Sequence, residues 1–323
     1  MGDSPRDSAR GERFWDGYFR SLKPLEVEEP IDVWVHRPPA YVLARLLVPI
    51  KSISPNMVTL CSIALGCAAG GAIFSSYRWH LPLAGFLIFS SAVFDCADGQ
   101  LARLRKSSSA FGRMLDGMAD LVVSSVVVGG GAWLVLRKFH EPPLLFAVAL
   151  VLTVLTILTG SFHTTMYDHF KNVFLRMTHP SYREGEDLDV AEARYRAQRG
   201  SQSAVIRITW RVYFFYMRSQ ENYSTKFDPY AQRLLKEFPE YSAEHAAIYR
   251  KHAGAAMRLW RRFFGFGSLV FGLAVSIGFD VTEYYLLFRL VLLNAVFYGH
   301  LRPQQRLASM RTLQEIEEMA SAA

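Results

Sequence analysis

The chain has 323 residues, of which 51% are hydrophobic, and it carries a formal net charge of +7. Its mean hydropathy of +0.11 is the average of two kinds of segment: near-uncharged runs that are long enough to span a bilayer, and strongly charged stretches. This mixture excludes an ordinary soluble globular protein. The positive charge lies mainly between the apolar runs, which is typical of cytoplasmic loops facing anionic lipid. No nucleic-acid partner is indicated.

The N-terminal stretch carries charges of both signs. Met1–Arg20 has no apolar core, so no secretory signal is expected, and Arg6 stands where a myristoylation motif after Gly2 requires Ser or Thr. Residues 1–30 are therefore expected to form a polar, partly ordered cytoplasmic arm. Ile31–Ile50 mixes aromatic and aliphatic residues with arginines, which predicts an amphipathic helix in the membrane interface.

Six apolar runs are expected to cross the membrane as helices. They are Met57–Tyr77, Leu81–Leu104, Ala110–Leu136, Leu144–Phe162, Phe263–Phe279 and Tyr284–Leu301. The predicted fold is all-α, an integral membrane bundle of six transmembrane helices preceded by an interfacial amphipathic helix and carrying a helical cytoplasmic insert. The corresponding division of the chain is 1–30 for the arm, 31–165 for the interfacial helix and the first four spans, 166–262 for the insert, 263–302 for the last two spans, and 303–323 for a polar tail.

The distribution of Lys and Arg beside these runs predicts the topology. One side holds Arg37, Arg45, Lys51, the turn Arg103–Arg113, the insert and the arginines after residue 301. The other side holds Arg78, Arg137 and Lys138. A multi-pass protein with six spans, and with both termini and the aspartates on the cytoplasmic side, satisfies every segment.

Two kinds of residue inside the apolar runs are expected to have a structural role. Cys61, Cys67 and Cys96 lack metal-type spacing, so they are interpreted as buried small apolar residues without a disulfide framework. Arg289 lies near the outer end of the last span, where snorkelling to the interface is the expected behaviour.

Four carboxylates adjoin the apolar runs Leu81–Phe94 and Leu121–Leu136. On a helix Asp95 and Asp98 share one face, and so do Asp116 and Asp120. If two antiparallel helices join through the intervening basic turn, all four carboxylates face one gap. At 1.5 Å per residue Asp98 and Asp120 lie roughly 9–15 Å below the cytoplasmic end of their helices, so the carboxylates are expected to line a cavity within reach of a lipid headgroup.

An oxygen-only cluster of this kind suits the hard cations Mg²⁺ or Mn²⁺, and two such ions shared among carboxylates can stabilise phosphoryl transfer. A remaining carboxylate can act as general base toward a hydroxyl. Arg103, one turn from Asp98, is placed to contact a diphosphate. Gly99, Ala102 and Gly112 leave space for a ligand near the backbone.

Aspartates at membrane depth have other interpretations. They can couple ions in a transporter or pair helices by hydrogen bonds. A transporter is expected to carry related features in both halves of the chain, and the later runs hold no matching carboxylates. A pseudoenzyme that keeps the fold for binding is a further alternative.

The spacing Asp95-x2-Asp98-Gly99-x2-Ala102-Arg103-x8-Gly112-x3-Asp116-x3-Asp120 resembles the complete signature of the CDP-alcohol phosphotransferase (CDP-alcohol phosphatidyltransferase) family. Pro55-Asn56-x2-Thr59 is similar to that family's entry to its first transmembrane helix. The resemblance covers roughly residues 31–165 and the last two spans, and it covers neither the arm nor the insert.

The resemblance implies Asp95, Asp98 and Asp116 as metal ligands, with Asp120 as a further ligand or as the base that activates the acceptor hydroxyl. It also implies a CDP site formed by Gly99, Ala102, Arg103 and Gly112, with Asn56 and Thr59 as further candidates near cytidine.

The implied reaction is attack of an alcohol oxygen on the phosphorus distal to cytidine, with release of CMP. The favoured donor is CDP-diacylglycerol and the favoured acceptor a small polar alcohol. The turn Ser107–Ser109 faintly resembles choline/ethanolamine phosphotransferases, whose acceptor is diacylglycerol. A homodimer is also considered.

Overall fold

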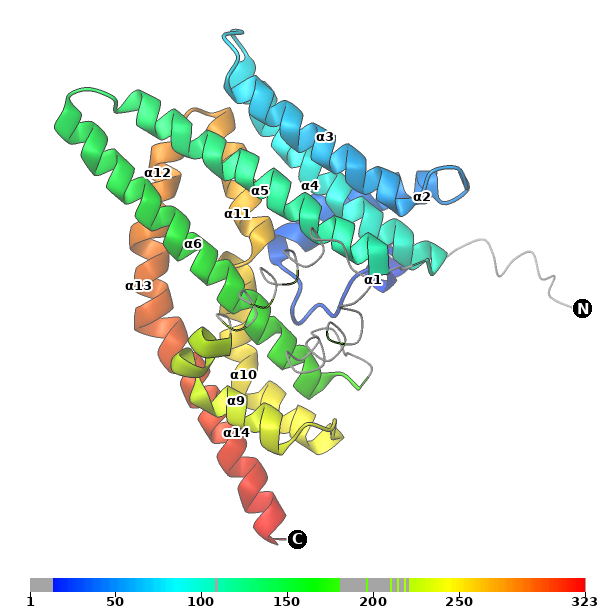
Figure 1. Cartoon of the computed structure of the whole chain (residues 1–323). Helices are drawn as coiled ribbons and strands as arrows, with labels where there is room; N and C mark the ends of the chain where they lie inside the picture. Colours follow the sequence, from blue (N-terminus) through cyan, green and yellow to red (C-terminus); the bar gives the residue numbers. More distant parts are fainter. Residues whose placement is uncertain are drawn as a thin grey trace, which may run out of the picture. The chain divides into compact units, whose positions relative to one another are not determined.

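The computed structural model describes residues 14–107, 110–180 and 221–322, together with residues 196, 210, 214 and 218 (Figure 1). All of the regular structure in these residues is helical, which confirms the all-α part of the predicted fold class. Three predicted features lie partly outside the described residues. They are the first part of the arm, Ser108 and Ser109 of the serine turn, and the part of the insert from 181 to 220, apart from the four residues named above.

The helices follow one another along the chain in a fixed order. They are α1 (Phe14–Arg20), the π-helical turn η1 (Asp32–His36), α2 (Arg37–Leu47), α3 (Pro55–Ile73), α4 (His80–Arg105), α5 (Ala110–Lys138), α6 (Pro143–Thr178), α9 (Pro229–Glu237), α10 (Ala243–Phe263), α11 (Phe266–Gly278), α12 (Thr282–Leu287), η3 (Phe288–Leu293), α13 (Asn294–Val296), η4 (Phe297–Leu301) and α14 (Arg302–Ala322).

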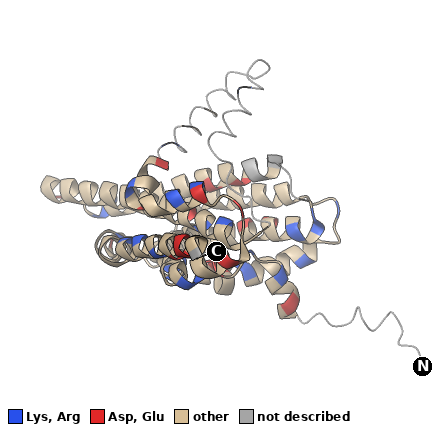
Figure 2. Cartoon of the chain, turned by 90° about the horizontal axis from the view of Figure 1, so that it is seen from below, with Lys and Arg blue, Asp and Glu red and all other residues tan. Residues whose placement is uncertain are grey.

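Five helical stretches among the described residues are long and apolar enough to cross a bilayer. They are Pro55–Ile73, His80–Arg105, Leu115–Lys138, Pro143–Thr178 and Thr282–Ser321. In the cartoon of Figure 2, long stretches of the helices are tan and hold no Lys, Arg, Asp or Glu. The predicted span Phe263–Phe279 corresponds to α11, which has only 13 residues, fewer than the roughly 20 that a perpendicular span requires. That Phe263–Phe279 crosses the membrane, and that α2 lies in the membrane interface, therefore stay predictions.

The chain divides into two compact units. The first comprises Met1–Leu158 and Phe266–Val291, and the second comprises Thr159–Gly265 and Leu292–Ala323. Both α6 and the stretch from α12 to α14 pass from one unit into the other. The four predicted carboxylates all belong to the first unit.

Close contacts between α3, α4 and α5 form the core of the first unit. Ser62 Oγ donates to the carbonyl of Ser91 at 2.9 Å, and Ser91 Oγ donates to the carbonyl of Ser62 at 2.8 Å. A Cβ on Gly66 would lie 2.8 Å from a Val123 methyl carbon, so α3 and α5 approach closely because this residue has no side chain. Such small-residue contacts are typical of helices packed in membranes.

Cys61 and Cys67 are exposed in the structure, which makes the prediction that they are buried wrong. They share one face of α3 with exposed Leu60. In a helix that crosses a membrane such a face can contact lipid, where a small apolar thiol needs no protein neighbour.

Arg289 also differs from its expected behaviour. It is 3% exposed, and its Nη1 donates to the hydroxyl of Tyr285 at 3.2 Å, so it faces the protein instead of snorkelling outward. The tyrosine, one turn away on the same helical stretch, supplies the polar contact that burial of a guanidinium requires.

At Gly85 the backbones of α4 and α11 approach each other closely. A Cβ there would lie 2.5 Å from the carbonyl oxygen of Ala274 and 2.9 Å from Cα of Gly278. Because both neighbours are backbone atoms, we expect Gly85→Ala to lower the free energy of unfolding by roughly 1–3 kcal/mol. Gly71→Ala is the matched control, since no atom lies within 4 Å of its Cβ position. Thermal unfolding in detergent should show a lower Tm for the first variant alone, and equal Tm values would contradict this packing.

The second unit is built around buried aromatic residues and one buried carboxylate. Phe170 stacks on Trp260 with ring centroids 5.3 Å apart. Asp228 caps α9 by accepting from the backbone N–H of Tyr230 at 3.1 Å, and it also accepts from Ser309 Oγ of α14 at 2.6 Å. Burial nevertheless raises the pKa of Asp228 above its ordinary value.

Candidate active site

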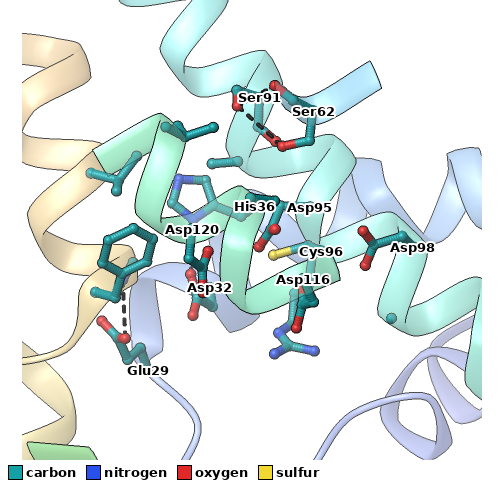
Figure 3. Close-up of a pocket in the computed structure, with 18 of the residues that line it drawn as sticks. Glu29, Asp32, His36, Ser62, Ser91, Asp95, Cys96, Asp98, Asp116 and Asp120 are labelled. Atoms are coloured by element: carbon teal, nitrogen blue, oxygen red, sulfur yellow. Dashed lines mark hydrogen bonds and ion pairs between the residues drawn. The ribbon is translucent and has the colours of Figure 1, made fainter. Parts of the chain in front are cut away.

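The acidic residues predicted from the sequence come together between α4 and α5. One carboxylate oxygen from each of Asp95, Asp98 and Asp116 lies within 4.8 Å of the other two. Asp120, one turn further along α5, lines the same pocket without belonging to this group (Figure 3). Three carboxylates converging at this distance are an oxygen-only donor set, which fits a hard divalent cation.

The pocket encloses a volume of about 220 Å³. The predicted residues that line it are Asp95, Asp98, Gly99, Arg103, Asp116 and Asp120. Ala102, Gly112 and Asn56, which were predicted for the CDP site, are not among its lining residues. Thr59 contacts the site indirectly, because its hydroxyl donates to Asp98 Oδ2. The roles of all these residues stay predictions.

Arg103 lines the pocket and is anchored by a backbone carbonyl. Its Nε donates to the carbonyl of Ser21 at 2.6 Å. Its Nη1 lies over Gly99, where a Cβ would approach it to 3.3 Å. The guanidinium is also close enough to Asp98 and Asp116 for electrostatic interaction. The glycine of the motif therefore provides room for the arginine of the motif.

Sequence reasoning missed the N-terminal side of the pocket. Its lining also includes Lys23, Glu29, Asp32, His36 and Arg37, from the segment after α1 and from the start of α2. The only signal in the sequence is that charged residues cluster there just before an amphipathic stretch, a pattern also typical of a solvated arm.

This N-terminal segment is held in place by buried polar contacts. Tyr18 is fully buried, and its hydroxyl donates to the carbonyl of Val33. Burial raises the pKa of Tyr18 to about 12, so the phenol stays a donor at neutral pH. Glu28 forms an ion pair of 3.0 Å with Arg37 and accepts from the backbone N–H of Lys23 at 3.0 Å. The segment is therefore part of the folded first unit.

Glu29 fastens the same segment to α11. It accepts hydrogen bonds from the backbone N–H of Gly267 at 3.1 Å, and from the N–H and hydroxyl of Ser268, both at 2.8 Å. These N–H groups are the unsatisfied donors at the start of a helix, where a carboxylate oxygen is a favourable acceptor.

The attachment through Glu29 is expected to depend on pH. Burial, with a smaller contribution from Asp32, raises the pKa of Glu29 from 4.5 to about 8. Folding therefore favours the protonated carboxyl, and its contribution to stability is full below about pH 4.5 and is lost as pH rises through about 8. We expect the Tm of the wild-type protein to fall between about pH 5 and 9 more than that of Glu29→Gln, which stays neutral. Parallel Tm profiles would contradict this.

Comparison with known proteins agrees with the resemblance seen in the motif. Residues 52–176 match the family model described as CDP-alcohol phosphatidyltransferase. This range contains α3, α4, α5 and most of α6, including all four aspartates.

Three curated relatives have named activities. The chain is 31% identical over 122 residues to a phosphatidylinositol phosphate synthase of Corynebacterium glutamicum, covering 36% of this chain and 54% of that protein. It is 39% identical over 93 residues to a CDP-diacylglycerol–glycerol-3-phosphate 3-phosphatidyltransferase of Cereibacter sphaeroides, covering 25% and 41%. It is 36% identical over 72 residues to a CDP-diacylglycerol–serine O-phosphatidyltransferase of Helicobacter pylori, covering 22% and 29%. The chain thus spans about half or less of the length of these relatives.

Proposed function

Because residues 52–176 belong to the CDP-alcohol phosphatidyltransferase family, we propose that this protein is a membrane-embedded, metal-dependent transferase of phospholipid synthesis. It moves a substituted phosphate group from a CDP-linked donor to an alcohol hydroxyl and releases CMP. The observation that carries the proposal is the convergence of Asp95, Asp98 and Asp116 within 4.8 Å in a pocket that Arg103 also lines.

In this proposal the aspartates hold the metal. Asp95, Asp98 and Asp116 supply ligands for Mg²⁺ or Mn²⁺, and Asp120 either completes a two-ion site or takes the proton of the acceptor. A bound divalent cation would offset the negative charge of the diphosphate, which is the main electrostatic requirement of phosphoryl transfer.

The donor is proposed to bind along the motif face of α4. Arg103 contacts the diphosphate, and Gly99 leaves the space in which its guanidinium lies. Ala102 and Gly112 contribute small surfaces beside the nucleotide. Asn56 and Thr59, in the first turns of α3, lie near cytidine, with the Thr59 hydroxyl linked to Asp98.

CDP-diacylglycerol is the favoured donor and a small polar alcohol the favoured acceptor. Two of the three relatives carry CDP-diacylglycerol in their names, and their named acceptors are serine and glycerol 3-phosphate. The alternative is a CDP-choline- or CDP-ethanolamine-type donor with diacylglycerol as the acceptor. We place the pocket and both termini on the cytoplasmic side, as the distribution of basic residues predicts. A homodimer is compatible with this arrangement.

The assay that tests this function measures CMP release by the purified full-length protein in detergent or nanodiscs with Mg²⁺ or Mn²⁺. CDP-diacylglycerol is offered with a panel of small alcohols, and CDP-choline and CDP-ethanolamine are offered with diacylglycerol. We expect release in the first arm that depends on both the alcohol and the metal. Release confined to the second arm would reverse the donor assignment, and no release in either would refute the proposal.

A further inference from the structure

A second cavity lies in the second unit, where α9 packs against η4 and α14 (Figure 1). It encloses about 470 Å³. Two arginines, Arg302 and Arg306, line it together with two tyrosines, Tyr230 and Tyr298. All four residues lie outside the matched family segment, and none of them lines the pocket that holds the aspartates. The cavity is therefore a feature separate from the proposed catalytic site.

This cavity gathers positive charge without a compensating carboxylate. None of the described residues that line it is acidic. The side chain of Arg302 has neither a hydrogen-bond nor an ion-pair partner among the described residues, and its guanidinium lies 5.6 Å from the centre of the Phe227 ring. Two cations in a hollow without a counter-charge attract an anion from outside the protein.

The backbone before α9 holds both guanidinium groups in place. Arg306 donates from Nε to the carbonyl of Phe227 and from Nη2 to the carbonyl of Lys226, the latter at 2.7 Å. Its Nη1 has no hydrogen-bond partner among the described residues. Arg302 is oriented by the ring of the same Phe227. Planar guanidinium groups that are positioned in advance and keep free donors are suited to the oxygens of a phosphate.

The sequence around the cavity indicates where the anion comes from. The apolar run Tyr284–Leu301 ends immediately before Arg302. In the topology proposed above this is the cytoplasmic boundary of the last span, where phospholipid phosphates lie and where the leaflet is anionic. The cavity lining also includes Leu307, which is 40% exposed, and Tyr298, which is 49% exposed. An anion with apolar chains fits this mixture better than a small soluble anion does.

We propose that this cavity binds the phosphate group of an anionic phospholipid from the surrounding membrane. Arg302 and Arg306 donate to the phosphate oxygens, the hydroxyls of Tyr230 and Tyr298 supply neutral donors, and the acyl chains extend along the apolar run that precedes Arg302. The site does not depend on the proposed catalysis, and it requires only that the last span crosses the membrane.

The test compares two variants of the cavity with one matched control. Arg302→Gln removes one guanidinium, and Leu307→Glu places a carboxylate in the cavity from an exposed position. Arg311→Gln removes the same charge from an exposed residue of α14 that does not line the cavity. Native mass spectrometry measures the binding of phosphatidylglycerol, phosphatidylcholine and inorganic phosphate to the delipidated full-length protein. EDTA is present so that no metal-dependent turnover occurs, and the Tm without lipid reports folding.

We expect the wild-type protein to bind phosphatidylglycerol about tenfold more tightly than phosphatidylcholine, since the cavity is positive. Arg302→Gln and Leu307→Glu should each weaken phosphatidylglycerol binding by about tenfold or more with little change in Tm, and Arg311→Gln should bind as the wild type does. If Arg302→Gln does not fold, Leu307→Glu decides the result alone, because its side chain replaces one that already faces outward.

Three results would overturn the site. They are equal affinity of the wild type for the two lipids, equal weakening in Arg302→Gln and Arg311→Gln, and unchanged affinity in Leu307→Glu. An affinity for inorganic phosphate that matches the affinity for phosphatidylglycerol, and that is lost in Arg302→Gln, would assign the cavity to soluble phosphate compounds and overturn the lipid as its ligand.

Discussion

Replacement of Asp116 by Asn is expected to lower CMP release by about a thousandfold or more, equivalent to about 4 kcal/mol of transition-state stabilisation. Asp116 is the only member of the carboxylate group that comes from α5, whereas Asp95 and Asp98 both come from α4. The amide removes one negative charge where the three oxygens converge. It changes the shape of the side chain very little, so insertion and folding should be retained.

Metal binding provides a second measurement for the same variant. The Tm of the wild-type protein should rise with added Mn²⁺ or Mg²⁺, since an ion that binds only the folded state stabilises it, and this rise should be absent in Asp116→Asn. Asp280→Asn is the matched control. Asp280 lies in the turn after α11 at a φ of 57°, a conformation that Asn also adopts readily. Turnover above a tenth of wild type in Asp116→Asn would contradict the assigned site.

The two helical pairs of aspartates could be predicted because both rest on local geometry. The spacing from Asp95 to Asp98 and the short turn before α5 confine these side chains to facing helices, and the structure brings them together with Asp116. Long apolar runs were equally informative, since helix length and hydropathy are local properties.

The remaining wall of the pocket depends on contacts between distant parts of the chain. The hydrogen bonds from Gly267 to Glu29 and from Arg103 to Ser21 join residues far apart in sequence, and no periodicity indicates them. The ends of helices are also hard to predict from the sequence. The helix α6 continues to Thr178, well past the apolar run that ends at Phe162, because hydropathy falls there without any Gly or Pro to end the helix.

Replacement of Arg103 by Lys is expected to raise the KM of the CDP-linked donor and to lower kcat/KM by about 100-fold, because hydrogen bonds between charged groups contribute roughly 1.5–3 kcal/mol each. The guanidinium uses Nε to reach the carbonyl of Ser21 while its Nη1 lies over Gly99 at the pocket. A lysine ammonium is a single point and cannot do both. Arg103→Lys should therefore lose either the anchor or the diphosphate contact.

Arg105, two residues further along α4, separates these effects from a general loss of structure. Its guanidinium donates to carbonyl groups at the end of α2 and in the loop before α3, including Ile50 O at 2.9 Å and Val48 O at 3.3 Å, and it does not line the pocket. We expect Arg105→Ala to lower the Tm with donor KM unchanged per folded protein. For Arg103→Lys we expect a raised donor KM with the Tm unchanged. If Arg103→Lys lowers only the Tm, the guanidinium serves to hold Ser21, and the diphosphate must be bound by the other cations of the pocket, Lys23 and Arg37.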